Sequence, residues 1–321
     1  MKILFHENQL SYRGTSKALY DYAHYNEQIL NNESIILYNK SNENNFDEAV
    51  KKFKNRFKVI EYNEIKEIDK IIEKEKVDLF YAIKYGYNDN IISKNCKTAI
   101  HTVFKCYEPH GDVYSYVSKW LSKLMTNSDS NYVPHIIDLP NHNFDLRSEL
   151  NIPNDAIVFG RHGGAETFDI KFVQEVIKNF SRTKKKVYFL FLGTNSFVKR
   201  NIFRPYKNII FLSSTIDEHY KLKFINTCDA YIHARVQGES FGIAIGEFSI
   251  KNKPIITWGL SDEKAHLEIL QDKAIIYNNS KELINILENF EPSTKQIWDM
   301  YSEEFSPKNV MKKFKEIFIN E

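Results

Sequence analysis

The stretch DAYIHARVQGESFGIAIGEFSIKNKPIITW, residues 229–258, decides the fold of the second half of the chain. Its apolar start, 229–233, predicts a buried strand, and 254–258 predicts another. Between them, Gly238 permits a turn, and the segment that begins near Gly242 is compatible with a helix. A strand, a helix and a second strand in this order indicate a parallel βαβ unit.

The same alternation of short apolar runs and longer amphipathic runs extends along the whole chain. The other predicted strands are 2–6, 34–38, 57–61, 77–83, 98–104, 156–160, 187–192, 208–212 and 274–277. The other predicted helices include 15–30, 64–76, 113–125, 168–180, 217–227 and 280–290. The pattern predicts an α/β fold of two tandem Rossmann-like parallel-sheet domains. Ligands bind beyond the carboxyl ends of such strands, so we expect a site in a cleft between the domains.

A boundary is predicted in residues 131–144, NYVPHIIDLPNHNF, where two prolines and three asparagines interrupt the periodicity. The chain has 321 residues, which suits two domains. We therefore predict an N-terminal domain over 1–140, a C-terminal domain over 141–303 and a final helix in 304–321. Ser306 is a candidate N-cap of that helix, with Pro307 at its first position.

Composition excludes some classes of protein. Charged residues make up 27% of the chain and nearly balance, giving a net charge of +2, which argues against nucleic-acid binding by bulk electrostatics. The three cysteines, Cys96, Cys106 and Cys228, have no spacing that suits a zinc site, and they fit a reducing compartment. MKILFH predicts a strand rather than a signal peptide, and no apolar run is long enough to span a membrane. We expect a cytoplasmic protein.

The exit of the first strand is a candidate ligand site. Arg13 and Gly14 lead into Thr15 and Ser16 at a predicted helix start, where free N–H groups favour a phosphate or a sugar hydroxyl. The alternative is an ordinary turn in which Thr15 or Ser16 only caps the helix. Neither the dinucleotide fingerprint nor the P-loop pattern occurs here.

A second candidate follows the strand 156–160 in AIVFGRHGGAETFDI. Arg161 lies at the strand end, next to Gly163 and Gly164, which expose the backbone. A guanidinium binds phosphate oxygens in a bidentate manner, so Arg161 is a candidate diphosphate clamp. The alternative is a surface arginine in a flexible loop.

Glu239 and Glu247 form the third candidate. A carboxylate accepts hydrogen bonds from two hydroxyl groups well, and a ribose or a hexose presents such pairs. A helix that begins near Gly242 would also direct free N–H groups toward an anion. Spacing alone leaves the alternative open that both residues are solvated acids.

Glu239-Ser240-Phe241-Gly242 with Glu247 resembles the E-x7-E signature of retaining glycosyltransferases of the GT-B fold, most closely glycosyltransferase family 4. The GRHGG segment lies where that family keeps its arginine loop, and VPHIIDLPN resembles the interdomain segment. The final helix resembles one that crosses back to the first domain. The resemblance is strongest in residues 157–300.

The resemblance implies a role for each motif. Glu247 would hold the ribose of a nucleoside diphosphate sugar, and Glu239 would contact the transferred sugar. Arg161 would neutralise charge on the leaving phosphate without a metal or other cofactor. The first domain would bind the acceptor, with Gly14 and Thr15 lining the cleft. The donor-binding segments would be Gly163, Gly164, Ser240 and the N–H groups of Phe241, Gly242 and Ile243.

Two positions depart from the family pattern. The family commonly has a lysine six residues after the arginine, where this chain has Thr167; Lys171 is then the candidate second phosphate clamp, or else a solvated helix lysine. A histidine of the first domain falls in register with Phe104. His110 is the candidate replacement, or else a structural or exposed residue. His101 lies nearby in the sequence, and His266 either faces the donor or caps a helix.

The resulting hypothesis is a retaining hexosyltransferase that uses a nucleoside diphosphate sugar and a glycan or lipid-linked acceptor. The alternatives are a sugar-nucleotide epimerase of the same fold and a non-catalytic carbohydrate-binding relative. No nucleic-acid partner is expected. Weak peripheral membrane contact could come from Lys119, Trp120 and Lys123, which also fit an amphipathic core helix.

Overall fold

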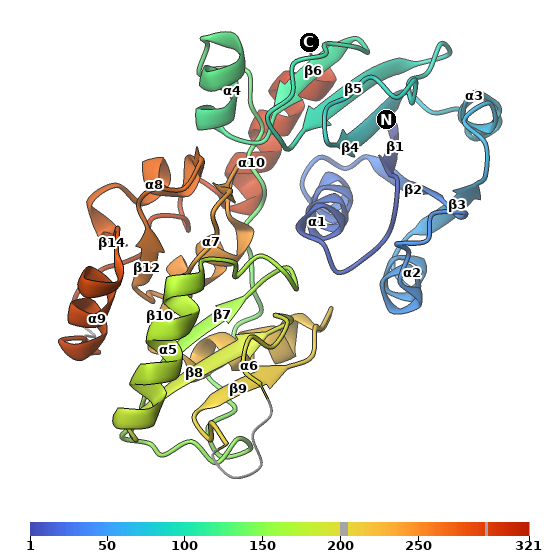
Figure 1. The fold of residues 1–321 in the computed structure, drawn as a ribbon. Coiled ribbons are helices and arrows are strands. Elements are labelled where there is room, and N and C mark those ends of the chain that lie inside the picture. Colours follow the sequence, from blue (N-terminus) through green and yellow to red (C-terminus); the bar gives the residue numbers. More distant parts are fainter. Residues whose placement is uncertain (200–204, 293–294, 321) are drawn as a thin grey trace. The chain divides into compact units, whose positions relative to one another are not determined.

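A computed structural model describes residues 1–199, 205–292 and 295–320. The chain forms two compact units (Figure 1). The first unit contains residues 1–136 and the C-terminal segment from Glu303, and the second contains residues 137–302. Within the described ranges, no helix is long and apolar enough to cross a membrane.

The first unit is built on a six-stranded sheet in which all neighbouring strands are parallel, in the order β3-β2-β1-β4-β5-β6. The strands are β1 (Lys2–Glu7), β2 (Glu33–Asn39), β3 (Lys58–Tyr62), β4 (Leu79–Lys84), β5 (Lys97–Thr102) and β6 (Val113–Tyr116). Most side chains of β1, β2, β4 and β5 are buried because helices cover both faces of a parallel sheet.

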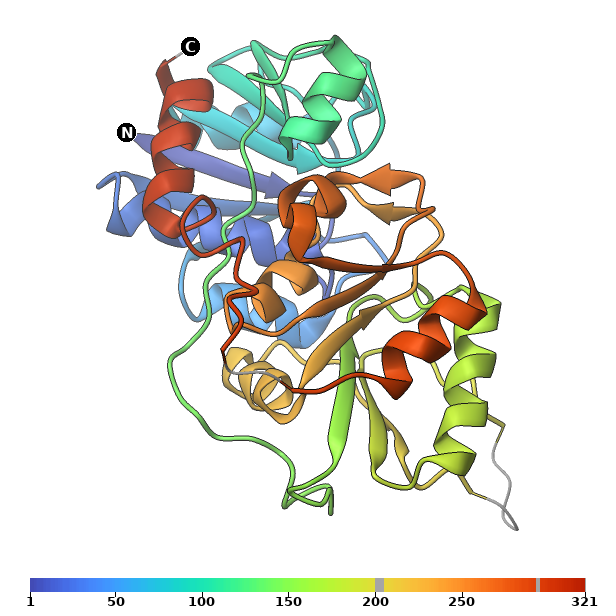
Figure 2. The same cartoon turned by 90° about the vertical axis from the view of Figure 1, so that its left-hand side faces the viewer.

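The helices of the first unit are α1 (Gly14–Gln28), α2 (Asp47–Lys54), α3 (Glu67–Glu75), α4 (Lys119–Thr126) and α10 (Pro307–Phe314), which continues as a π-helix (Lys315–Asn320). Ser306 caps α10 by accepting a hydrogen bond from the Asn309 amide, as the sequence predicts. The ring of Phe314 packs 5.2 Å from Tyr81 and 6.2 Å from Phe5 between centroids. The C-terminal helix, red in Figure 2, thereby completes the core of the first unit.

The second unit repeats the architecture with the strand order β14-β12-β10-β7-β8-β9, again all parallel. Its strands are β7 (Ile157–His162), β8 (Val187–Leu192), β9 (Ile209–Leu212), β10 (Ala230–His233), β12 (Ile255–Trp258) and β14 (Ala274–Tyr277). Its helices are α5 (Lys171–Thr183), α6 (Glu218–Thr227), α7 (Ile243–Ser249), α8 (Ala265–Leu270), a 3-10 turn (Gln271–Lys273) and α9 (Ser280–Glu288). A small separate sheet pairs β11 (Gly238–Glu239) with β13 (Glu263–Lys264).

The predicted alternation of parallel strands and helices is confirmed in both halves of the chain. One helix prediction, over 113–125, is wrong in its first part, because Val113–Tyr116 forms β6 and pairs with β5. Its valine and two tyrosines favour a strand. The helix starts only after Ser118, whose side chain caps it by accepting a hydrogen bond from the Leu121 amide.

Candidate functional site

Polar side chains gather at the carboxyl edge of the sheet in the second unit. The adjacent strands β7, β10 and β12 end at His162, His233 and Trp258. The segments that follow these strands hold Gly163 and Gly164 in a loop and Glu239 on β11, and the sequence predicts all three as ligand contacts. This edge is where open parallel sheets bind ligands.

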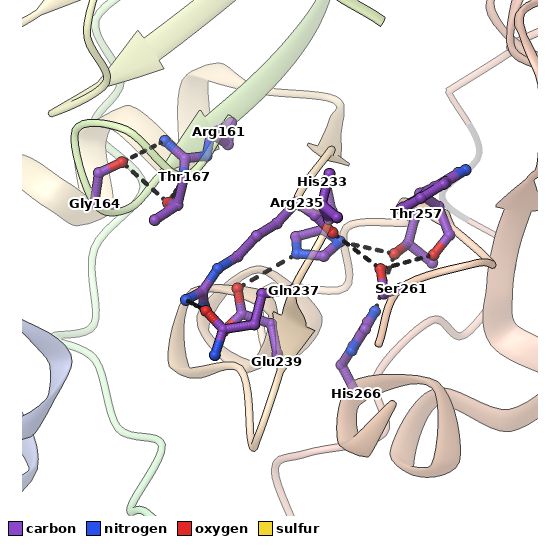
Figure 3. A network of polar contacts seen from close by, with 12 residues as sticks. Arg161, Gly164, Thr167, His233, Arg235, Gln237, Glu239, Thr257, Ser261 and His266 are labelled. Carbon is purple, nitrogen blue, oxygen red and sulfur yellow. Dashed lines mark hydrogen bonds and ion pairs between the residues drawn. The ribbon is translucent and has the colours of Figure 1, made fainter. Parts of the chain in front are cut away.

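Arg161, next to the end of β7, is only 3% exposed. Its Nη1 donates at 3.2 Å to the carbonyl oxygen of Gly164, and its Nη2 donates to the hydroxyl of Thr167 (Figure 3). Nη1 also donates to the hydroxyl of Thr194. All three acceptors are neutral. Across the described parts of the chain, its Nε has no hydrogen-bond partner and no carboxylate lies within ion-pair distance. Burial lowers the pKa of the guanidinium, yet arginine stays charged at any physiological pH.

The glycine loop is shaped around this guanidinium. Gly163 has a φ of +154°, and a Cβ atom there would lie 2.7 Å from Nη2 of Arg161. Thr167, where the family pattern has lysine, also donates to the carbonyl oxygen of Gly164 at 3.0 Å. Lys171 is exposed at the first position of α5, and its role as a phosphate clamp stays a prediction. The alternative of Arg161 as a flexible surface residue is wrong, because its side chain is buried and hydrogen-bonded.

Glu239 lies on β11 with its side chain 25% exposed. Arg235 Nη1 is 3.1 Å from Oε2, and His233 Nε2 is 3.3 Å from Oε1 (Figure 3). Burial acts to raise the pKa of this carboxyl, but the hydrogen bond from His233 and the charge of Arg235 outweigh it and lower the pKa to about 2. Glu239 is therefore a carboxylate at neutral pH, with part of its surface open to a ligand.

A buried hydrogen-bond chain orients His233 toward Glu239. A carboxylate only accepts, so Nε2 of His233 is the donor, and in the neutral ring Nδ1 accepts from the Thr257 hydroxyl at 2.9 Å. His266 Nε2 lies 3.1 Å from the same hydroxyl, and burial lowers the pKa of His266 to about 3, so this ring is neutral. His266 therefore acts behind Glu239 rather than at the exposed surface.

Helix α7 starts where the sequence predicts. Gly242 precedes its first residue with a φ of +93°, a left-handed conformation that favours glycine. Phe241 is buried against the ring of Tyr301, with centroids 5.9 Å apart, while Ser240 and Ile243 are half-buried. The role of the amides of Phe241, Gly242 and Ile243 in diphosphate binding stays a prediction.

Glu247, on α7, has no exposed surface. Lys221 Nζ from α6 is 2.5 Å from Oε1, and His162 Nε2 from the end of β7 is 2.9 Å from Oε2. Lys221 also lies 2.6 Å from a carboxylate oxygen of Glu218. The alternative of Glu247 as a solvated helix acid is therefore wrong. A ribose reaches this carboxylate only where Lys221 or His162 shares it or moves aside.

An open hollow of 510 Å³ lies at the exit of β9 and the start of α6, the helix that also carries Lys221. It combines two aromatic rings with hydroxyl groups and one carboxylate. The lining residues are Phe211, Leu212, Ser213, Ser214, Thr215, Asp217 and Tyr220. Asp217 also caps α6 by accepting hydrogen bonds from the amides of His219 and Tyr220.

In the first unit, Gly14 and Thr15 open α1. Thr15 donates its hydroxyl to Oε1 of Glu7, and Ser16 donates to Oε2 at 2.6 Å. Burial raises the pKa of Glu7 to about 7, against the lowering effect of these two hydroxyl donors. No side chain caps α1, so the alternative of simple capping by Thr15 or Ser16 is wrong.

The two histidines of the first unit differ in their surroundings. His110 is buried in the loop between β5 and β6, with Nδ1 2.6 Å from the carbonyl oxygen of Glu108 and Nε2 3.1 Å from Nζ of Lys84. His101 is fully buried, with Nδ1 2.6 Å from the hydroxyl of Tyr81, and burial lowers its pKa to about 3. His101 thus belongs to the core, whereas a catalytic role of His110 stays a prediction.

Several residues that complete these clusters carry no motif in the sequence: His162, Lys221, His233, Thr257 and Glu7. Each of them except Lys221 is an ionisable or hydroxyl residue at or near the carboxyl end of a strand, and that shared position is the signal that identifies such residues. In the described part of the chain, no group of three or more His, Cys, Asp and Glu side chains is arranged to hold a metal ion.

Comparison with known proteins gives matches in structure only. No family model matches the chain, and no curated protein sequence is significantly similar to it. Among solved structures, a glycosyltransferase from Rickettsia africae ESF-5 is 16% identical with a TM-score of 0.67, covering 100% of this chain and 99% of that one. HepE from Anabaena, solved with UDP and glucose, is 13% identical with a TM-score of 0.73 and 98% coverage of each chain.

A TarM mutant from S. aureus, solved with fondaparinux, alpha-GlcNAc-glycerol and UDP, is 11% identical with a TM-score of 0.68. The match covers 99% of this chain and 100% of that one. These full-length matches confirm the predicted fold class, two Rossmann-like parallel-sheet domains as in GT-B glycosyltransferases.

Proposed function

We propose that the protein is a retaining glycosyltransferase that moves a hexose from a nucleoside diphosphate sugar to an acceptor. The observation that carries this proposal is the environment of Arg161. Its charge is buried, its hydrogen-bond acceptors are neutral, and no carboxylate among the described residues lies within ion-pair distance, although the charge of Glu239 acts on it from further away. A buried charge without an ion-pair partner is costly, so a site of this kind favours an anionic ligand.

A diphosphate supplies that anion. In the proposed reaction, the bond between C1 of the sugar and the diphosphate oxygen breaks, and the acceptor oxygen bonds to C1 on the same face. The acceptor proton passes to the leaving diphosphate. Arg161 neutralises the charge that develops there, and its fixed position means that little reorganisation is needed during the reaction. The retained stereochemistry follows the resemblance to family 4.

The neighbouring groups divide the rest of the donor. We assign the transferred sugar to Glu239, because its ionised and partly exposed carboxylate can accept hydroxyl hydrogen bonds. The diphosphate lies against Gly163, Gly164 and the amides that follow Ser240, with Lys171 as an outer cation. Glu247 takes the ribose. This order leaves the hollow at the start of α6 for the base, where Phe211 and Tyr220 offer aromatic surface.

The structural matches support this proposal at the level of the fold. The similar structures are glycosyltransferases, and the structure of HepE contains UDP and glucose. That this chain binds a nucleotide base, transfers a hexose and uses an acceptor is part of the proposal.

Incubation with sugar nucleotides tests the reaction class. UDP-, GDP- and ADP-hexoses are incubated with the protein without acceptor, and the products are separated by chromatography. A transferase slowly releases free sugar and nucleoside diphosphate, and faster turnover follows addition of a glycan acceptor. Conversion of the donor into an epimeric sugar nucleotide would instead establish the epimerase.

A further inference from the structure

Three aromatic rings stack at the carboxyl edge of the sheet in the first unit. They come from the loops after β4 and β5, and we call Tyr85, Tyr87 and Phe104 the aromatic platform. The ring of Tyr85 lies 4.6 Å from that of Tyr87 at an interplanar angle of 6°, and 4.7 Å from that of Phe104 at 25°. Tyr85 is 44% exposed and Tyr87 is 53% exposed. Two exposed rings thus gather in one place with the half-buried Phe104 beside them, and a grouped apolar patch marks a binding site more often than singly scattered exposed side chains do.

The backbone under these rings is fixed. The Asn88 amide donates to Oε2 of Glu108 at 2.9 Å, which ties the two loops together. The hydroxyl of Tyr114 donates to the carbonyl oxygen of Gly86 at 2.9 Å. Gly86 has a φ of +129°, and a Cβ atom there would lie 2.5 Å from Cγ2 of Thr102. Gly86 therefore packs directly on β5, and the platform is formed before any ligand arrives, which lowers the entropy cost of binding.

The charges around the platform restrict the class of ligand. In the two loops that carry it, the other exposed polar residues from Asn88 to Asn90 and from Lys105 to Glu108 include one basic residue, Lys105, and one acidic residue, Glu108. Anionic membranes and single-stranded nucleic acids both require clusters of basic side chains beside the aromatic rings. A saccharide does not, because a pyranose offers an apolar face of C–H groups and a rim of uncharged hydroxyls.

We propose that the aromatic platform binds a pyranose ring of a saccharide acceptor by stacking. This proposal rests on the proposed function, because the bound saccharide is an acceptor only if the protein is a glycosyltransferase. The C–H face of the sugar lies on the exposed ring of Tyr87, and Asn88 and Glu108 are placed to bond its hydroxyls. The acceptor is thus a glycan that is recognised through its sugar rings rather than through a lipid portion.

The test measures binding of the full chain to immobilised oligosaccharides that contain hexose, N-acetylhexosamine or uronic acid, and to vesicles of phosphatidylcholine with phosphatidylglycerol. The wild type should bind at least one oligosaccharide and should not bind the vesicles. Tyr87→Ala should weaken saccharide binding about tenfold, while Tyr87→Phe keeps the ring and the affinity. Leu124→Ala removes an equally exposed apolar side chain from α4 of the same unit and should change nothing.

Three results would overturn the proposal: no saccharide binding by a wild type that binds nucleotide, unchanged saccharide binding by Tyr87→Ala, or vesicle binding that Tyr87→Ala abolishes. Calorimetry with UDP and GDP on the same samples separates this proposal from the proposed function. Saccharide binding through Tyr87 without any nucleotide binding would contradict the transferase and leave the platform in place. Thermal unfolding of each variant shows that it is folded, as expected for substitutions of exposed side chains.

Discussion

The two sheets share one architecture and carry opposite chemistry at their carboxyl edges. In the second unit, the edge holds Arg161 and the ionised Glu239. In the first unit, the same edge presents the stacked rings of Tyr85 and Tyr87 over a nearly neutral surround. This difference between the two edges indicates that the fold determines only where a ligand binds. The side chains at the strand ends decide whether that ligand is an anion or an uncharged sugar.

The largest effect is expected at the buried cation. Arg161→Met should lower turnover of the preferred sugar nucleotide by about 10²–10³-fold, because the leaving diphosphate loses its fixed positive charge. Initial rates of donor hydrolysis and transfer measure this. Arg182→Met, which removes an exposed arginine of the same unit, is the matched control. Equal rates for wild type and Arg161→Met would contradict the proposal that the edge of the second unit binds an anion through Arg161.

The next largest effect is expected at the buried carboxylate of Glu247 in the second unit. Glu247→Ala should weaken nucleotide binding by about 2–4 kcal/mol, since a ribose loses two charge-assisted hydrogen bonds. The same change leaves Lys221 buried without this carboxylate, so the protein should also unfold more easily. The double variant Glu247→Ala with Lys221→Ala separates the two effects. It should regain stability without regaining nucleotide affinity, and recovered affinity would remove Glu247 from the donor site.

The carboxyl groups Glu239 and Glu7 should give opposite dependences of stability on pH. The pKa of Glu239 is lowered from 4.5 to about 2, so the folded protein binds fewer protons than the unfolded chain between these values. Its contribution is complete above pH 4.5 and is lost as the pH falls through 2; the ceiling is about 3 kcal/mol. The pKa of Glu7 is raised to about 7, so its effect runs the other way: the free energy of unfolding falls as the pH rises from 4.5 to 7.

Denaturant unfolding at several pH values measures both effects as differences from Glu239→Gln and Glu7→Gln. The wild type should lose its advantage over Glu239→Gln on acidification, and its advantage over Glu7→Gln should decline from pH 4.5 to pH 7. The same pH dependence for Glu239→Gln and Glu7→Gln, each relative to the wild type, would contradict the opposite pKa shifts of the two carboxyl groups.

The smallest effect concerns Lys171, which is exposed at the start of α5. As an outer phosphate clamp, Lys171→Ala should raise the KM for the donor about three- to fivefold, the size expected of an exposed charge. Lys178→Ala on the same helix is the control. An unchanged KM would establish Lys171 as a solvated helix lysine. Phosphate binding would then be left to Arg161 and its neighbours.

The sequence is sufficient to predict the parallel sheets, because each buried strand is a short apolar run followed by a turn signal. It is insufficient at 113–125, where pairing with β5 overrides the helical spacing. For the site, the resemblance identifies Arg161, Glu239 and Glu247 as candidates. It does not identify their partners, because Lys221 and His162 lie 26 and 85 residues from Glu247 in sequence and meet it only in the folded unit.

Phe104 illustrates the same limit. In the sequence it stands as a departure from the family pattern, in register with a histidine. In the structure its ring stacks on Tyr85, a contact between two loops that no local pattern predicts. A position that departs from the family pattern thereby becomes part of the proposed acceptor site.

The central claim is that the buried guanidinium of Arg161 binds the diphosphate of the donor. Isothermal titration calorimetry of the wild type and Arg161→Met with UDP, GDP, ADP and CMP tests it most directly. The proposal predicts that the wild type binds at least one nucleoside diphosphate more tightly than CMP, and that Arg161→Met loses this preference. Binding of none of the four nucleotides by the folded wild type would contradict it.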